Sequence, residues 1–245
     1  METPLPVTIL FTPDEEVGTP STRELIEMEA AKNKYVLVPE PASADGGAVT
    51  GRYAIARFNL AAKGKPSHAS WALEDGRSAI AAMAKKILEI EAMTTPDCTF
   101  SVGVVNGGQW VNCVSSACSA EVLSMAKRQA DLDAGVERML GLNGEENGVV
   151  FEVTRGVTRP VWEPDAGTLA MYDLAKDIAS EIGFELTHGS AGGGSDGNFT
   201  GAMGIPTLDS IGVRGRGLHT LDEHIFIDSL VERAQLMAGM LLRLQ

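Results

Sequence analysis

Three glutamates near the start of the chain are candidates for chemistry. Glu15 and Glu16 follow an apolar, β-branched run from Leu5 to Thr12, and Glu40 follows a second such run, residues 35–39. In an open α/β sheet, ligands gather beyond the carboxyl ends of the strands. Carboxylates that converge there repel one another unless they are protonated or hold a cation. From the local sequence alone, a solvated acidic turn is the favoured interpretation, and a cation site or a protonated carboxyl is the alternative.

Histidines and glycine-rich segments supply further candidates. The sequence has four histidines: His68, His188, His219 and His224. His219 lies just after the glycine-rich segment 212–217, in a loop of the kind that often carries functional residues. The segment 192–197 (GGGSDG) can present backbone N–H groups to an anion, but no lysine follows it in P-loop spacing. Taken singly, each has an ordinary alternative, a surface histidine or a flexible loop.

Five short motifs follow one another along the chain. They are residues 12–18 (TPDEEVG), 38–41 (VPEP), 64–69 (GKPSHA), 192–197 (GGGSDG) and 218–223 (LHTLDE). In this order, and over essentially the whole chain, they resemble the M20 family of metallopeptidases. This family contains glutamate carboxypeptidases, aminoacylases and acetylornithine or succinyl-diaminopimelate deacylases. The resemblance implies a two-zinc hydrolase of amide bonds in small peptides or N-acyl amino acids.

The resemblance also implies roles for individual residues. Glu15 would be the general base that takes a proton from the attacking water. Glu16 and His219 would ligate one zinc ion and Glu40 the other, with cobalt or manganese as possible substitutes. Two neighbouring cations would polarise the amide carbonyl and activate water. His68 would reach into the site of a partner subunit and stabilise the oxyanion.

Substrate recognition and assembly follow from the same resemblance. Asn112, Gly193 and Gly194 would help to hold the carboxylate of the substrate. Many family members carry an arginine in a strand where this sequence has Leu123, and Arg159 is a candidate substitute as an anion contact. The inserted domain would pair two chains into a homodimer through an edge strand and a helix.

Part of the family's ligand set has no match in this sequence. None of the four histidines belongs to an H-x-D motif, and the bridging aspartate is also unmatched. We therefore expect a family member that lacks its N-terminal segment. Two alternatives remain open: a metal-poor dimeric remnant that binds small anions or a partner without hydrolysis, and an acid–base hydrolase that uses Glu15 and Glu40 without metal.

The elements that position these residues predict a discontinuous α/β domain with a ferredoxin-like α+β domain inserted in it. The predicted parts are residues 1–51 and 158–245 for the first domain and 52–157 for the second. Strands are expected at residues 5–12, 35–39, 53–63, 99–106, 119–126, 149–155, 184–187 and 205–209. Helices are expected at residues 22–34, 75–93, 130–140, 165–182 and 228–244. The inserted part has the order β-α-β-β-α-β, which is typical of a split βαβ unit.

Composition excludes several classes of partner. The chain has 245 residues, with 20 basic and 33 acidic side chains and a net charge of −13, so nucleic acid and anionic membranes are not expected partners. Its three cysteines show no C-x-x-C spacing, which favours a reducing compartment. No apolar run is long enough to span a membrane, and the first residues lack a basic signal-peptide region. We expect a cytoplasmic protein.

Overall fold

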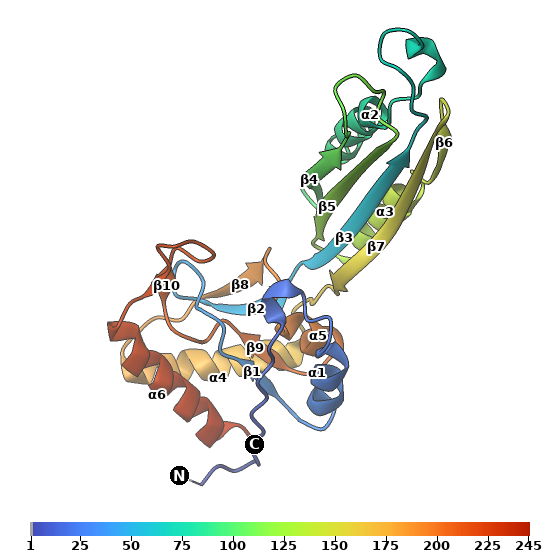
Figure 1. Cartoon of the computed structure of the whole chain (residues 1–245). Helices are drawn as coiled ribbons and strands as arrows, with labels where there is room; N and C mark the ends of the chain where they lie inside the picture. The colour runs from blue at the N-terminus through green and yellow to red at the C-terminus, as the bar shows by residue number, and fades with distance from the viewer. Residues whose placement is uncertain (1) are drawn as a thin grey trace. The chain divides into compact units, whose positions relative to one another are not determined.

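The chain folds into two compact units. The computed structural model describes residues 2–245, apart from the side chain of Val157 (Figure 1). Unit 1 comprises residues 1–53 and 160–245, and unit 2 comprises residues 54–159. The polypeptide therefore enters and leaves unit 2 between the two parts of unit 1.

Unit 1 is built on a four-stranded mixed sheet with the order β1-β9-β2-β8. The strands are β1 (Val36–Val38), β2 (Ala48–Arg52), β8 (His188–Ala191) and β9 (Thr207–Asp209). β1 pairs with β9 and β2 with β8 in parallel, whereas β2 and β9 are antiparallel. The helices are α1 (Arg23–Ala30), α4 (Ala166–Ile182), α5 (Gly197–Ala202) and α6 (Asp228–Arg243). α4 packs against α6, and α1 packs against α5.

Helix α4 shows how local sequence sets an element. Asp165 caps its start by accepting a hydrogen bond from the Thr168 amide at 2.6 Å, and Gly183 ends it in the left-handed region at φ 107°. Met171 and Ala175 on its buried face join a core that also contains Leu236 of α6. The helix predicted over residues 165–182 is confirmed.

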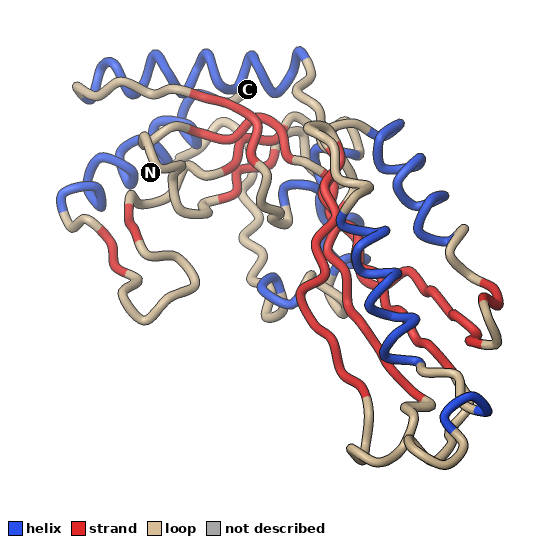
Figure 2. Tube along the Cα trace, turned by 90° about the horizontal axis from the view of Figure 1, so that it is seen from above, coloured by secondary structure: helices blue, strands red, loops and turns tan. Residues whose placement is uncertain are grey.

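Unit 2 is an antiparallel sheet of five strands with the order β4-β5-β3-β7-β6. The strands are β3 (Ala54–Lys63), β4 (Cys98–Gly107), β5 (Ala117–Ala126), β6 (Gly144–Glu146) and β7 (Val149–Arg159). In β3 buried and more exposed residues alternate, as expected for a strand with one face covered. The covering helices are α2 (Ala79–Glu91) and α3 (Gln129–Leu140), seen beside the sheet in Figure 2. The element order predicted for this part of the chain is therefore present, with β6 in addition.

The buried strand predicted at residues 5–12 is wrong. No strand is formed there, and Ile9 and Phe11 are 73% and 89% exposed. A strand buried on both faces needs hydrogen-bonded neighbours, and the strands of the four-stranded sheet pair with one another and not with this segment. The first of the predicted strands is therefore missing, whereas the strand predicted at residues 35–39 is present as β1.

Other boundaries shift for local reasons. Helix α1 begins at Arg23 and ends earlier than predicted, and no side-chain hydrogen bond caps its start. Instead, the Ser21 hydroxyl donates to the carboxylate of Asp14 at 2.7 Å. The strand predicted over residues 184–187 is displaced onto β8, while β2 and β6 were not predicted at all. The sequence signal for β6 was the Asn147-Gly148 dipeptide, which is typical of a two-residue hairpin turn. In the structure both residues have positive φ angles, 53° and 79°, as such a turn requires.

No helix in the described residues is long and apolar enough to cross a membrane, and the location of the protein in the cell stays a prediction.

Gly201 of α5 lies against the ring of Trp162, which is 1% exposed. A Cβ atom at this glycine would approach the indole ring to 2.2 Å, so Gly201→Ala forces the helix or the ring to move. We expect a loss of about 1–3 kcal/mol in the free energy of unfolding, measured by urea denaturation. The matched control is Gly189→Ala in β8, where the added atom has no neighbour within 4 Å. Equal losses in the two variants would contradict this packing argument.

Candidate active site

The turn that carries Glu15 and Glu16 is held by Asp196 of the segment 192–197 (GGGSDG). This turn is a short 3₁₀ helix, Glu15–Val17, with no buried residue. On either side of it, Thr12 and Thr19 donate hydroxyl hydrogen bonds to the two carboxylate oxygens of Asp196, at 2.9 and 2.7 Å. The second half of the GGGSDG motif therefore fixes the acidic turn from a distant part of the chain.

Glu16 and His219 meet in the structure. The Nε2 atom of His219 lies 3.3 Å from Oε2 of Glu16, and both side chains are exposed, at 78% and 77%. His219 lies in the loop between β10 (Gly215–Arg216) and β11 (His224–Ile225), which pair antiparallel. Its φ of 63° lies in the left-handed region, which is uncommon for a residue other than glycine. A carboxylate and an imidazole are common zinc ligands, and the structure brings this predicted pair together.

Glu40 lies close to the same carboxylates. It follows β1, and its carbonyl accepts a hydrogen bond from the Gly212 amide at 2.9 Å. Burial raises the pKa of its carboxyl to about 6, and the negative charges of Asp209 and Glu15 act in the same direction. A cation at this place would relieve that repulsion.

The fit to a metal ion is partial. Within residues 2–245, no group of three histidine, cysteine, aspartate or glutamate side chains is arranged to hold a metal ion. The pair of Glu16 and His219 offers two ligands of the right chemistry, whereas catalytic zinc takes three from the protein. The donor types suit zinc, but the described residues do not complete a zinc site.

Glu40→Gln is expected to stabilise the fold near pH 8 and to have little effect near pH 4. The folded-state pKa of Glu40 is raised, so the protonated carboxyl favours the folded state and this contribution is lost as the pH rises through about 6. The gain near pH 8 should be about 1 kcal/mol, because the side chain keeps part of its solvent contact. Thermal unfolding across this pH range measures it, with the exposed Glu24→Gln as control. A shift that does not depend on pH would contradict the assignment.

In unit 2, His68 is exposed and its ring is oriented. The ring stacks on Trp71 with centroids 5.0 Å apart, and Nδ1 accepts a hydrogen bond from the Ser70 amide at 3.3 Å. An acceptor at Nδ1 places the proton of the neutral ring on Nε2. The geometry therefore leaves Nε2–H as a hydrogen-bond donor, which is what a role in oxyanion stabilisation needs.

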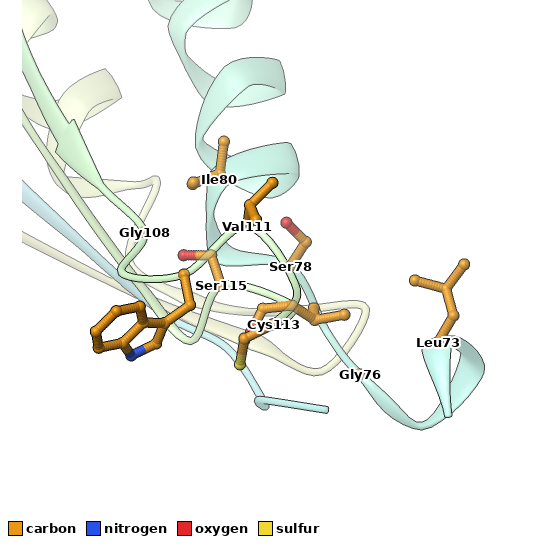
Figure 3. Close-up of a pocket in the computed structure, with 10 residues that line it drawn as sticks. Leu73, Gly76, Ser78, Ile80, Gly108, Val111, Cys113 and Ser115 are labelled. Atoms are coloured by element: carbon orange, nitrogen blue, oxygen red, sulfur yellow. The ribbon is translucent and has the colours of Figure 1, made fainter. Parts of the chain in front are cut away.

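His68 and Asn112 lie on neighbouring segments of unit 2. His68 pairs with Cys113 in an isolated β-bridge, and the carbonyl of Asn112 accepts from the Ala69 amide at 3.0 Å. Beside this pairing is a pocket of about 430 Å³, lined in part by Trp110 and by the exposed thiol of Cys113 (Figure 3). The structure thus brings two predicted site residues together next to a pocket.

Two charged residues with many contacts were not singled out in the sequence. Arg52 ends β2 and Asp209 ends β9, and both are buried in unit 1. Their guanidinium and carboxylate form an ion pair, and Arg52 also donates to the carbonyl of Gly193 at 2.8 Å. The available signal was a lone charge at the end of each buried strand, where α/β sheets collect functional residues.

Arg159 differs from the other predicted substrate-binding residues. It is 4% exposed, whereas Asn112 and Gly193 are exposed and Gly194 is half-buried. A direct contact between Arg159 and a substrate anion stays a prediction. Leu123 of β5 is 40% exposed and faces Arg57 of β3 in the strand register.

A mixed α/β fold with a carboxylate–imidazole pair beside further carboxylates is typical of metal-dependent hydrolases. Within that class the chain belongs to peptidase family M20/M25/M40, whose sequence model matches residues 1–243. This family is generally metal-dependent, with zinc as the usual ion.

Individual relatives agree with the family. Carboxypeptidase G2 from Pseudomonas sp. (strain RS-16) is 30% identical over 245 residues, covering 96% of this chain and 58% of the relative. A succinyl-diaminopimelate desuccinylase from Psychrobacter sp. (strain PRwf-1) is 26% identical and covers 96% and 62%. Among solved structures, aminopeptidase PepT from Bacillus cereus matches with a TM-score of 0.74 at 25% identity, covering 90% of this chain and 61% of PepT. The chain thus spans about three-fifths of the length of these relatives.

Proposed function

We propose that this protein hydrolyses amide bonds in small peptides or N-acyl amino acids with the help of zinc. The observation that carries the proposal is the 3.3 Å approach of Glu16 and His219, which are about two hundred residues apart in the sequence. Glu15 and Glu40 lie near enough to influence each other electrostatically at the same place. The names of the relatives, a carboxypeptidase, a desuccinylase and an aminopeptidase, describe the removal of a terminal residue or of a succinyl group.

The residues of this chain have distinct roles in the proposal. Glu16 and His219 would hold one metal ion and Glu40 the other, and these ions would polarise the amide carbonyl and lower the pKa of water. Glu15 takes a proton from the attacking water and returns it to the leaving amine, as a general base and then a general acid. Cobalt or manganese can replace zinc with such ligands. The described residues supply only part of a zinc site, so the remaining ligands are left open.

Groups from four further residues bind the substrate. The Nε2–H of His68, from a partner subunit, donates a hydrogen bond to the oxyanion. The backbone N–H groups of Gly193 and Gly194, with Asn112, hold the substrate's carboxylate. Leu123 occupies a position where many family members have arginine. We therefore expect the enzyme to show no preference for substrates with a C-terminal glutamate.

The homodimer proposed with this function uses unit 2, the inserted domain, as its pairing surface. β4 is an edge strand, and its Val104 and Val105 are 42% and 48% exposed. On the neighbouring helix α2, Ile80 and Leu88 are 43% and 72% exposed. An edge strand with exposed apolar side chains is suited to pairing with a second chain. Analytical ultracentrifugation tests this, and a monomer at micromolar concentration would contradict it.

The decisive test joins metal content with turnover. The purified natural protein is assayed for zinc by elemental mass spectrometry, and for hydrolysis of N-acetyl amino acids and dipeptides with and without a chelator. We expect bound zinc and activity that the chelator removes and added zinc restores. Activity that resists the chelator would favour an acid–base hydrolase using Glu15 and Glu40.

The second candidate is a metal-poor protein that binds small anions or a partner without hydrolysis. The incomplete ligand set within residues 2–245 is the observation that favours it. Absence of both zinc and turnover in the natural protein, together with measurable binding of a small carboxylate, would establish this candidate in place of the hydrolase.

A further inference from the structure

Arg52 and Asp209 form a buried ion pair in unit 1. The Arg52 side chain is 8% exposed and the Asp209 side chain is fully buried, and Arg52 Nε donates to Asp209 Oδ2 at 2.7 Å. Buried ion pairs of this kind seldom stabilise a fold more than apolar side chains of similar size would. A structural role alone therefore does not explain why this pair is present.

One of the two remaining nitrogens of Arg52 reaches the glycine-rich loop, residues 192–197, and the other reaches the residue that follows β9. Nη1 donates to the carbonyl of Gly193 at 2.8 Å, and Nη2 donates to the hydroxyl of Ser210 at 3.1 Å. Ser195 is tied to the same pair, because its hydroxyl donates to Asp209 Oδ2. The ion pair thus holds the loop at Gly193 and again two residues later.

Glycines give this loop no side chains with which to hold itself. Gly193 is exposed and Gly194 is half-buried, so their orientation depends on backbone contacts. The carbonyl of Gly193 and the N–H of Gly194 belong to one planar trans peptide, in which they point in opposite directions. A carbonyl held toward Arg52 therefore turns the Gly194 N–H away from Arg52 and out of the buried network.

We propose that Arg52 is a positioning residue, which fixes the Gly193–Gly194 peptide so that its N–H can bind a carboxylate. The identity of that carboxylate as part of the substrate rests on the proposed function. A guanidinium suits this task because its planar fork reaches three partners at once, which the single ammonium of lysine cannot do in the same geometry.

The first test variant is Arg52→Lys, which keeps a positive charge beside Asp209. Its matched control is Arg243→Lys at the exposed pair with Glu181. We expect the backbone ¹⁵N order parameter of Gly194 to fall from about 0.85 to below about 0.6 in Arg52→Lys and to stay unchanged in the control. The dissociation constant for acetate, followed by the amide shift of Gly194, should rise about tenfold.

A second variant keeps the proposal open to refutation if the first does not fold. Arg52→Met combined with Asp209→Asn removes both buried charges but still leaves the Gly193 carbonyl without its donor. It should fold and show the same loss of order at Gly194. Unchanged order and unchanged acetate affinity in a folded variant would overturn the proposal.

Kinetics separate this inference from the proposed function. In an active protein, Arg52→Lys should raise KM for an N-acetyl amino acid about tenfold and change kcat by less than about threefold. A tenfold fall in kcat with an unchanged KM would overturn the positioning role of Arg52. If the natural protein hydrolyses no amide, the proposed function fails, while the order parameter and the acetate titration still decide the role of Arg52.

Discussion

Glu15→Gln is expected to lower kcat for amide hydrolysis by about 10²–10⁴-fold, the range that general acid–base catalysis contributes. Glutamine keeps the shape of the side chain but cannot accept the proton of the attacking water. Glu15 is half-buried in the short turn fixed through Asp196, so its replacement should not displace the turn. Steady-state kinetics with an N-acetyl amino acid give the change in kcat, and elemental analysis shows whether zinc is retained.

The control for this variant is Glu24→Gln. Glu24 lies in the first turn of α1 and is exposed, so it tests removal of one carboxylate near the same segment. It should keep kcat within about twofold of the natural protein. Full activity of Glu15→Gln would exclude Glu15 as the base, and loss of zinc along with activity would indicate a role in metal binding.

The parts of the fold that the sequence predicted are those with strong local signals. α4 has a capping aspartate, an apolar face and a terminal glycine, and each of these acts within a few residues. β3 alternates between buried and exposed residues because one face of its sheet is covered by helices. Such patterns need no knowledge of distant partners, which is why the predicted and observed elements agree.

Residues 5–12 were predicted as a strand on composition alone, and composition is not sufficient to predict a buried strand. Their apolar, β-branched composition suits a buried strand, but burial depends on neighbours that composition cannot reveal. In the structure Phe11 is 89% exposed, and the sheet of unit 1 is made by other segments. β2 was missed for the converse reason, since Gly51 and Arg52 break the apolar pattern of a strand that is buried throughout.

The residues of the candidate site also differ in how far the sequence alone predicts them. Glu16 and His219 were proposed from a family resemblance, and their approach to 3.3 Å depends on the tertiary fold. A role for Arg52 could not be predicted from the sequence, because it depends on three simultaneous contacts with Asp209, Gly193 and Ser210, each far away in sequence. Motifs can be identified from neighbouring residues in the sequence. The hydrogen-bond networks that orient these motifs form between strand ends that are distant in the sequence, so they require the tertiary structure.

Glu16→Gln and His219→Ala are each expected to weaken zinc binding by more than about 100-fold. Changes to residues that merely orient metal ligands cost about 10–100-fold in affinity, and loss of a ligand should cost more. The two side chains are exposed, so neither replacement should disturb the core. Isothermal titration with zinc measures the affinity, and His224→Ala, at an exposed histidine held by the Asp222 carbonyl, is the control.

The double variant of Glu16→Gln with His219→Ala tests whether the two residues share one ion. If both bind the same zinc, the first replacement already destroys the site, and the second should add less than its own single effect. Independent contributions would instead add in free energy and give the product of the two affinity losses. Such additivity, or an unchanged affinity in either single variant, would show that the 3.3 Å pair is an ordinary surface contact between a histidine and a glutamate.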